Sequence, residues 1–213
     1  MSSNTALLDT ILFSEGDFKN YDYIVKHKRN LLKAFNMCLT CILLCEDEKL
    51  EYSVDFKVLK DRVLTHDLDK FKPEIFYPYS KKYFDESDSE DEKYNYESSP
   101  LPDHVLAALD LDSYKDLKDD FEKAWELHYF NNRHHPEYYK ENGGKMEDID
   151  IFEMAIDFTA MSLKFGGQPY DYYQKKKPKL EKEFGDIINY DLLSALTKMI
   201  SKSYKFRIPR KID

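Results

Sequence analysis

The sequence predicts an all-α protein. Its 213 residues include only six glycines and few runs of β-branched residues, and its apolar side chains recur at helical spacing. Hydrophobic residues make up 42% of the chain, which is enough to bury a core and excludes disorder throughout. At this length we expect a single helical domain, formed by residues 1–84 and 103–213.

Six segments carry the helical pattern. We expect Ser53 to cap the second, Gly166 and Gly167 to stop the fourth, and Pro178 to interrupt the fifth. The predicted helices span residues 21–45, 53–68, 113–132, 149–165, 168–184 and 190–204.

Two segments do not follow the pattern. Pro73 and Pro78 predict that residues 71–84 form a short aromatic connector rather than a helix. Residues 85–102 contain seven acidic residues, four serines and two prolines, a composition typical of a flexible, solvated insert.

Composition also excludes several classes of protein. No apolar run approaches the roughly 20 residues of a membrane span. The net charge of −9 argues against a nonspecific nucleic-acid-binding protein. No secretory signal is visible, and three clustered cysteines do not form a disulfide framework, so we expect a cytoplasmic protein.

The three cysteines share one face of the first predicted helix. The spacing of Cys38, Cys41 and Cys45 is compatible with an iron–sulfur or zinc knuckle. However, their neighbours are apolar, and sites of that kind normally lie in turns. We interpret them as small buried side chains.

His66-Asp67 is the sharpest local feature. Adjacent side chains on a helix point about 100° apart, so both reach one metal only when the ion sits at a helix end. A histidine nitrogen and a carboxylate oxygen together suit Zn, Fe, Mn or Mg. The same dipeptide is also common in proteins that bind no metal.

Two further groups of polar residues stand out. His128, His134 and His135 fall within eight residues, and a helix reaching that far places His128 and His135 two turns apart on one polar face. Glu153 and Asp157 share a face of an otherwise apolar helix, where a carboxylate needs a cation or hydrogen-bond donors. A surface histidine cluster and an ordinary polar stripe are the alternatives.

In chain order these residues resemble a known family. The order His, His-Asp, His, His, Asp is that of the HD-domain superfamily of helical metalloenzymes. Residues 23–173 resemble a smaller HD-like family of unknown reaction, found in phages, bacteria and giant viruses. The matching pieces are His27, His66-Asp67-Leu68-Asp69-Lys70-Phe71, Ala124 to His128, Asn132 with His134 to Tyr139, Glu153-Met154 with Asp157, and Tyr172-Tyr173.

The resemblance implies an HD-like helical bundle with a metal centre between helices. It implies one divalent ion, or two, of Mn, Fe, Zn or Mg. The first ion would be held by His27, His66, Asp67 and Asp157. The second would be held by His128 with one or both of His134 and His135, and Asp67 would bridge the two ions.

The same resemblance implies catalytic roles. Lys70 would neutralise a phosphoryl oxygen, Glu137 would act as a general acid or orient a ligand, and Asp69 would be either a ligand's partner or a solvated acid. HD phosphomonoesterases often carry a glutamate where this chain has Lys70, so their mechanism does not transfer directly.

These observations predict a metal-dependent phosphohydrolase. Its substrate would be a nucleotide or other small phosphoester, attacked by a metal-activated water. An HD-type di-iron oxygenase is one alternative. Another is a non-catalytic protein, for example a viral one, that binds a nucleotide or a host partner.

Overall fold

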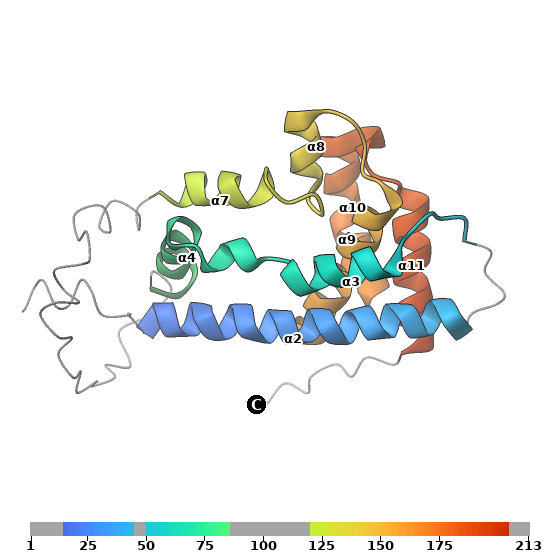
Figure 1. Cartoon of the computed structure of the whole chain (residues 1–213), viewed down its shortest axis with the longest axis horizontal. Coiled ribbons are helices and arrows are strands. Elements are labelled where there is room, and N and C mark those ends of the chain that lie inside the picture. Colours follow the sequence, from blue (N-terminus) through green and yellow to red (C-terminus); the bar gives the residue numbers. More distant parts are fainter. Residues whose placement is uncertain (1–14, 45–49, 86–119, 205–213) are drawn as a thin grey trace, which may run out of the picture. The chain divides into compact units, whose positions relative to one another are not determined.

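The computed structural model describes residues 15–44, 50–85 and 120–204, and all regular elements in these ranges are helical (Figure 1). The all-α prediction is therefore confirmed. The chain divides into two compact units, the first containing Met1–Ile24 and Asp67–His128 and the second Val25–His66 and Tyr129–Asp213. The predicted insert lies outside the described residues, apart from Asp85.

The longest helix, α2 (Glu15–Leu44), has 30 residues and contributes to both units. The prediction began this helix six residues late. In the second unit its buried face consists of small and apolar side chains at helical spacing. These are Leu31, Ala34, Phe35, Cys38 and Cys41.

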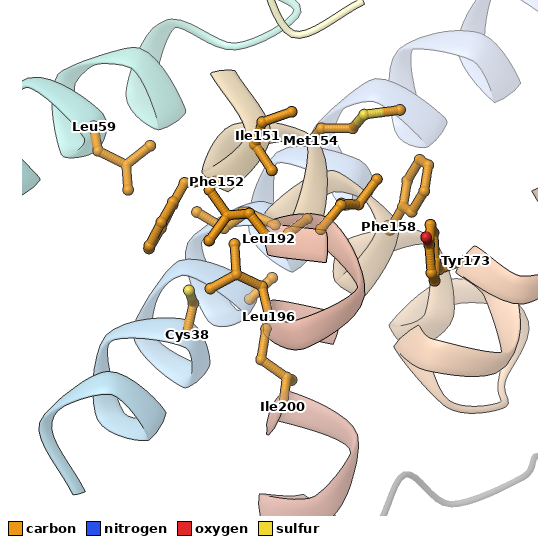
Figure 2. Close-up of a cluster of buried hydrophobic side chains, with 14 of the residues drawn as sticks. Cys38, Leu59, Ile151, Phe152, Met154, Phe158, Tyr173, Leu192, Leu196 and Ile200 are labelled. Carbon is orange, nitrogen blue, oxygen red and sulfur yellow. The ribbon is translucent and has the colours of Figure 1, made fainter. Parts of the chain in front are cut away.

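The second unit is built around α9 (Asp148–Phe165), which packs against α3 (Phe56–Thr65), α10 (Pro169–Phe184) and α11 (Tyr190–Ser203) (Figure 1). A helix packed against several others is expected to bury a wide apolar face, and α9 does so, although it also buries the carboxylates of Asp150 and Glu153. Figure 2 shows its side chains meeting residues of the other helices in one hydrophobic core. Labelled members of that core are Cys38, Leu59, Phe152, Phe158, Tyr173, Leu192, Leu196 and Ile200.

The first unit is smaller and rich in aromatic side chains. The short helix η1 (Leu68–Phe71) leads into α4 (Pro73–Ser80), which continues as a π-helical turn, η2 (Lys81–Asp85). The helix α7 (Phe121–Tyr129) joins them through rings, because Phe121 lies 5.1 Å from Tyr79 and 5.5 Å from Tyr83 between ring centroids. Asn20 ties α2 to α4 by donating to the Phe76 carbonyl at 2.9 Å.

Prolines caused two errors in the predicted elements. Residues 73–80 were expected to be a connector but form α4, because Pro73 occupies the first helical position, where no backbone N–H is needed. Pro78 and Pro178 both lie inside helices, so the predicted interruption of α10 is wrong. A single proline removes one hydrogen bond, and packing of the helix on its neighbours outweighs that loss.

Helix ends follow local chemistry. Asp55, not the predicted Ser53, caps α3 by accepting from the backbone N–H groups of Lys57 and Val58 at 2.8 and 3.3 Å. Gly166 and Gly167 end α9 with φ values of +78° and +95°, which confirms the predicted stop.

Two further findings bear on the predictions. Cys38 and Cys41 are buried side chains of the core, as expected. Burial raises the pKa of the Cys38 thiol to about 12, with Cys41 adding to the rise, so Cys38 is unreactive. Cys45 lies outside the described residues.

Among the described helices, none combines the length and the hydropathy required to span a membrane.

The core of the second unit predicts a contrast between two leucines. Leu193 on α11 is 0% exposed, so Leu193→Ala should lower the free energy of unfolding by about 2–5 kcal/mol through lost burial and a cavity. Leu43 on α2 is 77% exposed, and Leu43→Ala should change it by less than about 0.5 kcal/mol. Urea denaturation measures both, and equal effects would contradict this core.

Candidate metal centre

The position of His66 depends on how α3 ends. The helix stops at Thr65, and His66 follows with non-helical backbone geometry. Lys28 on α2 donates to three carbonyls at this end, those of Val63, Leu64 and His66, at 3.1, 3.0 and 2.6 Å. A lysine ammonium at a helix C-terminus satisfies carbonyls that have no partner within the helix. It therefore fixes the end of α3 beside α2, where His27 precedes Lys28.

His27, His66 and Asp157 form a group of donors within the second unit. Their ligand atoms all lie within 4.8 Å of one another, and His27 Nε2 lies 3.2 Å from Asp157 Oδ1. Both histidines are buried, at 3% and 4% exposure. Donors bound to one ion at about 2.0–2.2 Å lie about 3–3.5 Å apart, which is the separation of His27 and Asp157. Two imidazoles and one carboxylate match the preferences of Zn, Fe and Mn.

Glu153 orients the ring of His66. His66 Nδ1 lies 2.8 Å from Glu153 Oε1, and Arg62 Nε donates to Oε2 at 2.7 Å. Burial raises the pKa of Glu153, but the hydrogen bond from His66 and the charges of His134, His66 and Arg62 outweigh it and lower this pKa to about 2. An ionised carboxylate only accepts, so His66 Nδ1 carries the hydrogen. In the neutral ring, Nε2 then carries the lone pair that a metal requires.

A second donor group shares His66. His66, His134 and Glu153 are all buried, and their ligand atoms also lie within 4.8 Å of one another. The rings of His66 and His134 lie 4.0 Å apart at 30°, and His134 Nδ1 lies 3.5 Å from Glu153 Oε1. His135 continues the row of rings and stacks on Tyr129 at 4.0 Å. Because Glu153 already accepts from two groups, we assign it to orienting histidines rather than to holding an ion.

A buried carboxylate, Asp150, supports this arrangement one turn before Glu153 on α9. It is 0% exposed and accepts from Arg62 Nη2 at 2.6 Å and from Arg133 Nε and Nη2, each at 3.3 Å. It also accepts from the Tyr139 hydroxyl and from the Glu147 backbone N–H. A buried charge is tolerated only when it is paired and hydrogen-bonded, and Asp150 meets both conditions.

A pocket of about 300 Å³ opens beside these residues in the second unit. Every side chain that lines it carries a polar group. The lining residues are Arg62, Thr65, His66, Asn131, Asn132, Arg133, His134 and Glu153.

The first unit contains a cluster of its own around Asp67. Asp67 adopts a left-handed conformation, with φ of +59°, and its carboxylate accepts from Lys70 Nζ at 2.7 Å. His128 Nε2 lies 3.5 Å from Asp67 Oδ1, and His128 Nδ1 lies 2.9 Å from Asp69 Oδ2. Of the two roles left open for Asp69, the structure favours the partner of a histidine.

Comparison with known families adds one match. The model of a family described as a family of unknown function (DUF5662) matches residues 16–200. The chain belongs to this family. The matched region contains every residue of the clusters described above. No curated protein and no solved structure matches the chain.

In this DUF5662 member, the structure unites three of the four ligands predicted for the first ion: His27, His66 and Asp157. Asp67 belongs to the other unit, so its place in that ligand set stays a prediction. The second set combines His128 of the first unit with His134 and His135 of the second, and it too stays a prediction.

Other predictions about the site need correction. The polar face joining His128 to His135 does not exist, because α7 ends at Tyr129 and His134 and His135 lie in the following loop. The helix α8 (Pro136–Asn142), which was not predicted, carries Glu137. Burial raises the pKa of Glu137, and the charged groups that act on it lie on α8 and α10. Its role as a general acid stays a prediction.

Sequence reasoning missed the network formed by Arg62, Arg133 and Asp150. Glu153 was noticed as a carboxylate that needs donors, but its histidine partners were not identified. Asp150 offered a similar signal, since it is an acid in the first turn of an apolar helix and forms a capping box with Glu147. Its pairing with Arg62 spans 88 residues, and no local pattern reveals such a pair.

This network predicts that Asp150 is essential to stability. Asp150→Asn should lower the free energy of unfolding by about 3 kcal/mol or more, because it removes the charge that two guanidiniums share. The matched control is Asp186→Asn, which breaks an exposed ion pair with Lys145 and should have almost no effect. Urea denaturation of both variants measures the difference, and similar values would refute a structural role for the network.

Proposed function

We propose that this protein is a metal-dependent phosphohydrolase of the HD type, acting on a nucleotide or other small phosphoester. One observation carries the proposal: two buried imidazoles and one carboxylate, from His27, His66 and Asp157, converge in the order and residue types that the resemblance implies. These donors come from α2, from the end of α3 and from α9, so their meeting is a product of the fold.

The charge of this donor set suits an anionic substrate. His27 and His66 bind a metal as neutral ligands, and Asp157 contributes one negative charge, so a divalent ion there would keep a net positive charge. When bound, such an ion lowers the pKa of a coordinated water and polarises a phosphoryl oxygen. The roles of Asp67, Asp69, Lys70 and His128 in this chemistry rest on the sequence resemblance.

We also propose that the protein works in a reducing cytoplasm, a host's if the protein is viral. The two buried cysteines are free thiols, which fits that compartment. The proposed partner is a small phosphorylated molecule rather than a nucleic acid or a membrane.

The ligand set predicts a contrast between two residues of α2. His27→Gln should lower the metal content and should reduce phosphoester turnover by about 100-fold or more. The reason is that even the loss of a group that only orients a ligand lowers metal affinity or activity by about 10- to 100-fold. Arg29→Gln, at an exposed position two residues later, is the matched control and should retain both. Elemental analysis after loading with Mn²⁺, Fe²⁺ or Zn²⁺ measures the metal.

Turnover is measured without oxygen, with Mn²⁺ or Mg²⁺, on a panel of nucleoside phosphates and cyclic dinucleotides. Phosphate release or ring opening that depends on His27 is the expected result. A coloured iron protein that turns over only with dioxygen would favour the oxygenase instead. Tight nucleotide binding without turnover would favour a binding protein.

Glu153 should act as a positioning residue for His66. Glu153→Gln replaces a carboxylate, which can only accept, with an uncharged amide that can accept from or donate to His66 Nδ1. The tautomer is then no longer fixed, so metal affinity should fall by about 10- to 100-fold while the fold persists. Nitrogen NMR of His66 should show a mixture of tautomers in the variant and one tautomer in the native protein. Glu183→Gln, at an exposed position on α10, should leave both unchanged. An unaltered His66 spectrum in Glu153→Gln would contradict this role.

A further inference from the structure

The pocket beside His66 has a composition suited to an anion. Ligand pockets are usually lined mainly by apolar side chains, with a few polar groups that set orientation. This one presents two guanidiniums, two imidazoles, two amides and a hydroxyl, with Glu153 as its single carboxylate. Such a lining offers many hydrogen-bond donors and little apolar surface.

The two arginines of the pocket are held by carboxylates through one side of each guanidinium. Arg62 uses Nε and Nη2, which donate to Glu153 and Asp150. Arg133 also uses Nε and Nη2, which bond Asp150, and its Nη2 lies 3.2 Å from Glu147. Within the residues that the structure describes, no hydrogen bond uses Nη1 of either arginine. Each guanidinium therefore keeps two N–H donors for a ligand.

The two arginines do not give this pocket a strong net positive charge. Glu153 and Asp150 offset the charges of Arg62 and Arg133, so an anion would bind mainly through directed hydrogen bonds. The carboxylates also hold the guanidiniums in place, which reduces the entropy lost when a ligand binds. Two fixed guanidiniums suit the oxygens of a tetrahedral oxyanion.

We propose that this pocket binds an oxyanion through Nη1 of Arg62 and Arg133. The identity of the ligand rests on the proposed function: in a phosphohydrolase it is a phosphoryl group of the substrate. His66 belongs both to the pocket lining and to the donor group with His27 and Asp157. A phosphoryl group in the pocket therefore lies beside that donor group.

The shared residue couples the two ligands. A divalent ion held by His66 would add positive charge at the wall of the pocket, so oxyanion affinity should rise when the metal binds. By thermodynamic linkage, phosphate should raise metal affinity by the same factor.

The test uses inorganic phosphate as the probe and isothermal titration calorimetry on the full chain, both metal-free and loaded with Mn²⁺. Arg133 is the arginine to change, because Asp150 keeps Arg62, Tyr139 and the Glu147 N–H when Arg133 is lost. Arg133→Ala should weaken phosphate binding by about tenfold or more in both forms. Lys145→Ala, which removes an equal charge from an exposed ion pair, should not.

Arg133→Lys separates hydrogen bonding from charge, because lysine keeps the charge but lacks the second nitrogen of the fork. It should also weaken binding, by about threefold or more. Full affinity in Arg133→Lys, equal affinity in Arg133→Ala, or no phosphate binding in the native protein would each overturn the oxyanion site.

These results are independent of the proposed function. Phosphate binding that depends on Arg133, without turnover of any phosphoester, would support the pocket and contradict the phosphohydrolase. Phosphoester turnover with a KM unchanged in Arg133→Ala would support the phosphohydrolase and contradict the pocket.

Discussion

The hydrogen bond from His66 Nδ1 to Glu153 Oε1 is the contact on which the candidate metal centre depends. It decides which nitrogen of His66 carries a hydrogen and how the ring is turned. Without it, either tautomer could form, and His66 would offer a metal no fixed lone pair beside His27 and Asp157. The bond joins the end of α3 to the second turn of α9, so packing of these two helices is also part of the site.

The bond requires the Glu153 carboxylate to be buried, and the rest of the network offsets the cost of burying that charge. Arg62 bonds both Glu153 and Asp150, one turn apart on α9, so a single guanidinium neutralises two buried acids in part. Arg133 and Tyr139 also donate hydrogen bonds to Asp150, and these bonds anchor the loop and the helix that follow His128. The same contacts that stabilise α9 therefore set the positions of His66 and His134.

The fold could be predicted further from the sequence than the site could. The periodicity of α9 and α11 gave bounds within one residue, because hydrophobic spacing is local information. The errors at α3 and α4 arose where two local signals compete, Ser53 against Asp55 as a cap and a proline against packing. The pairing of Arg62 with Asp150 depends on tertiary packing, which hydrophobic periodicity does not indicate. For the site, the sequence shows the residue types and their order along the chain. It does not show which carboxylate orients which histidine.

Each unit orients one histidine in the same way. In the second unit Glu153 accepts from Nδ1 of His66, and in the first Asp69 lies 2.9 Å from Nδ1 of His128, whose Nε2 faces Asp67. A histidine held only for packing has no need of a carboxylate on one nitrogen, since a backbone carbonyl or a water would satisfy it. A carboxylate at Nδ1 makes Nε2 more basic, which strengthens a metal ligand. Both instances of this pairing lie within the region that the family model matches, and each places a carboxylate at Nδ1 of a buried histidine, which is the arrangement that the proposed metal chemistry requires.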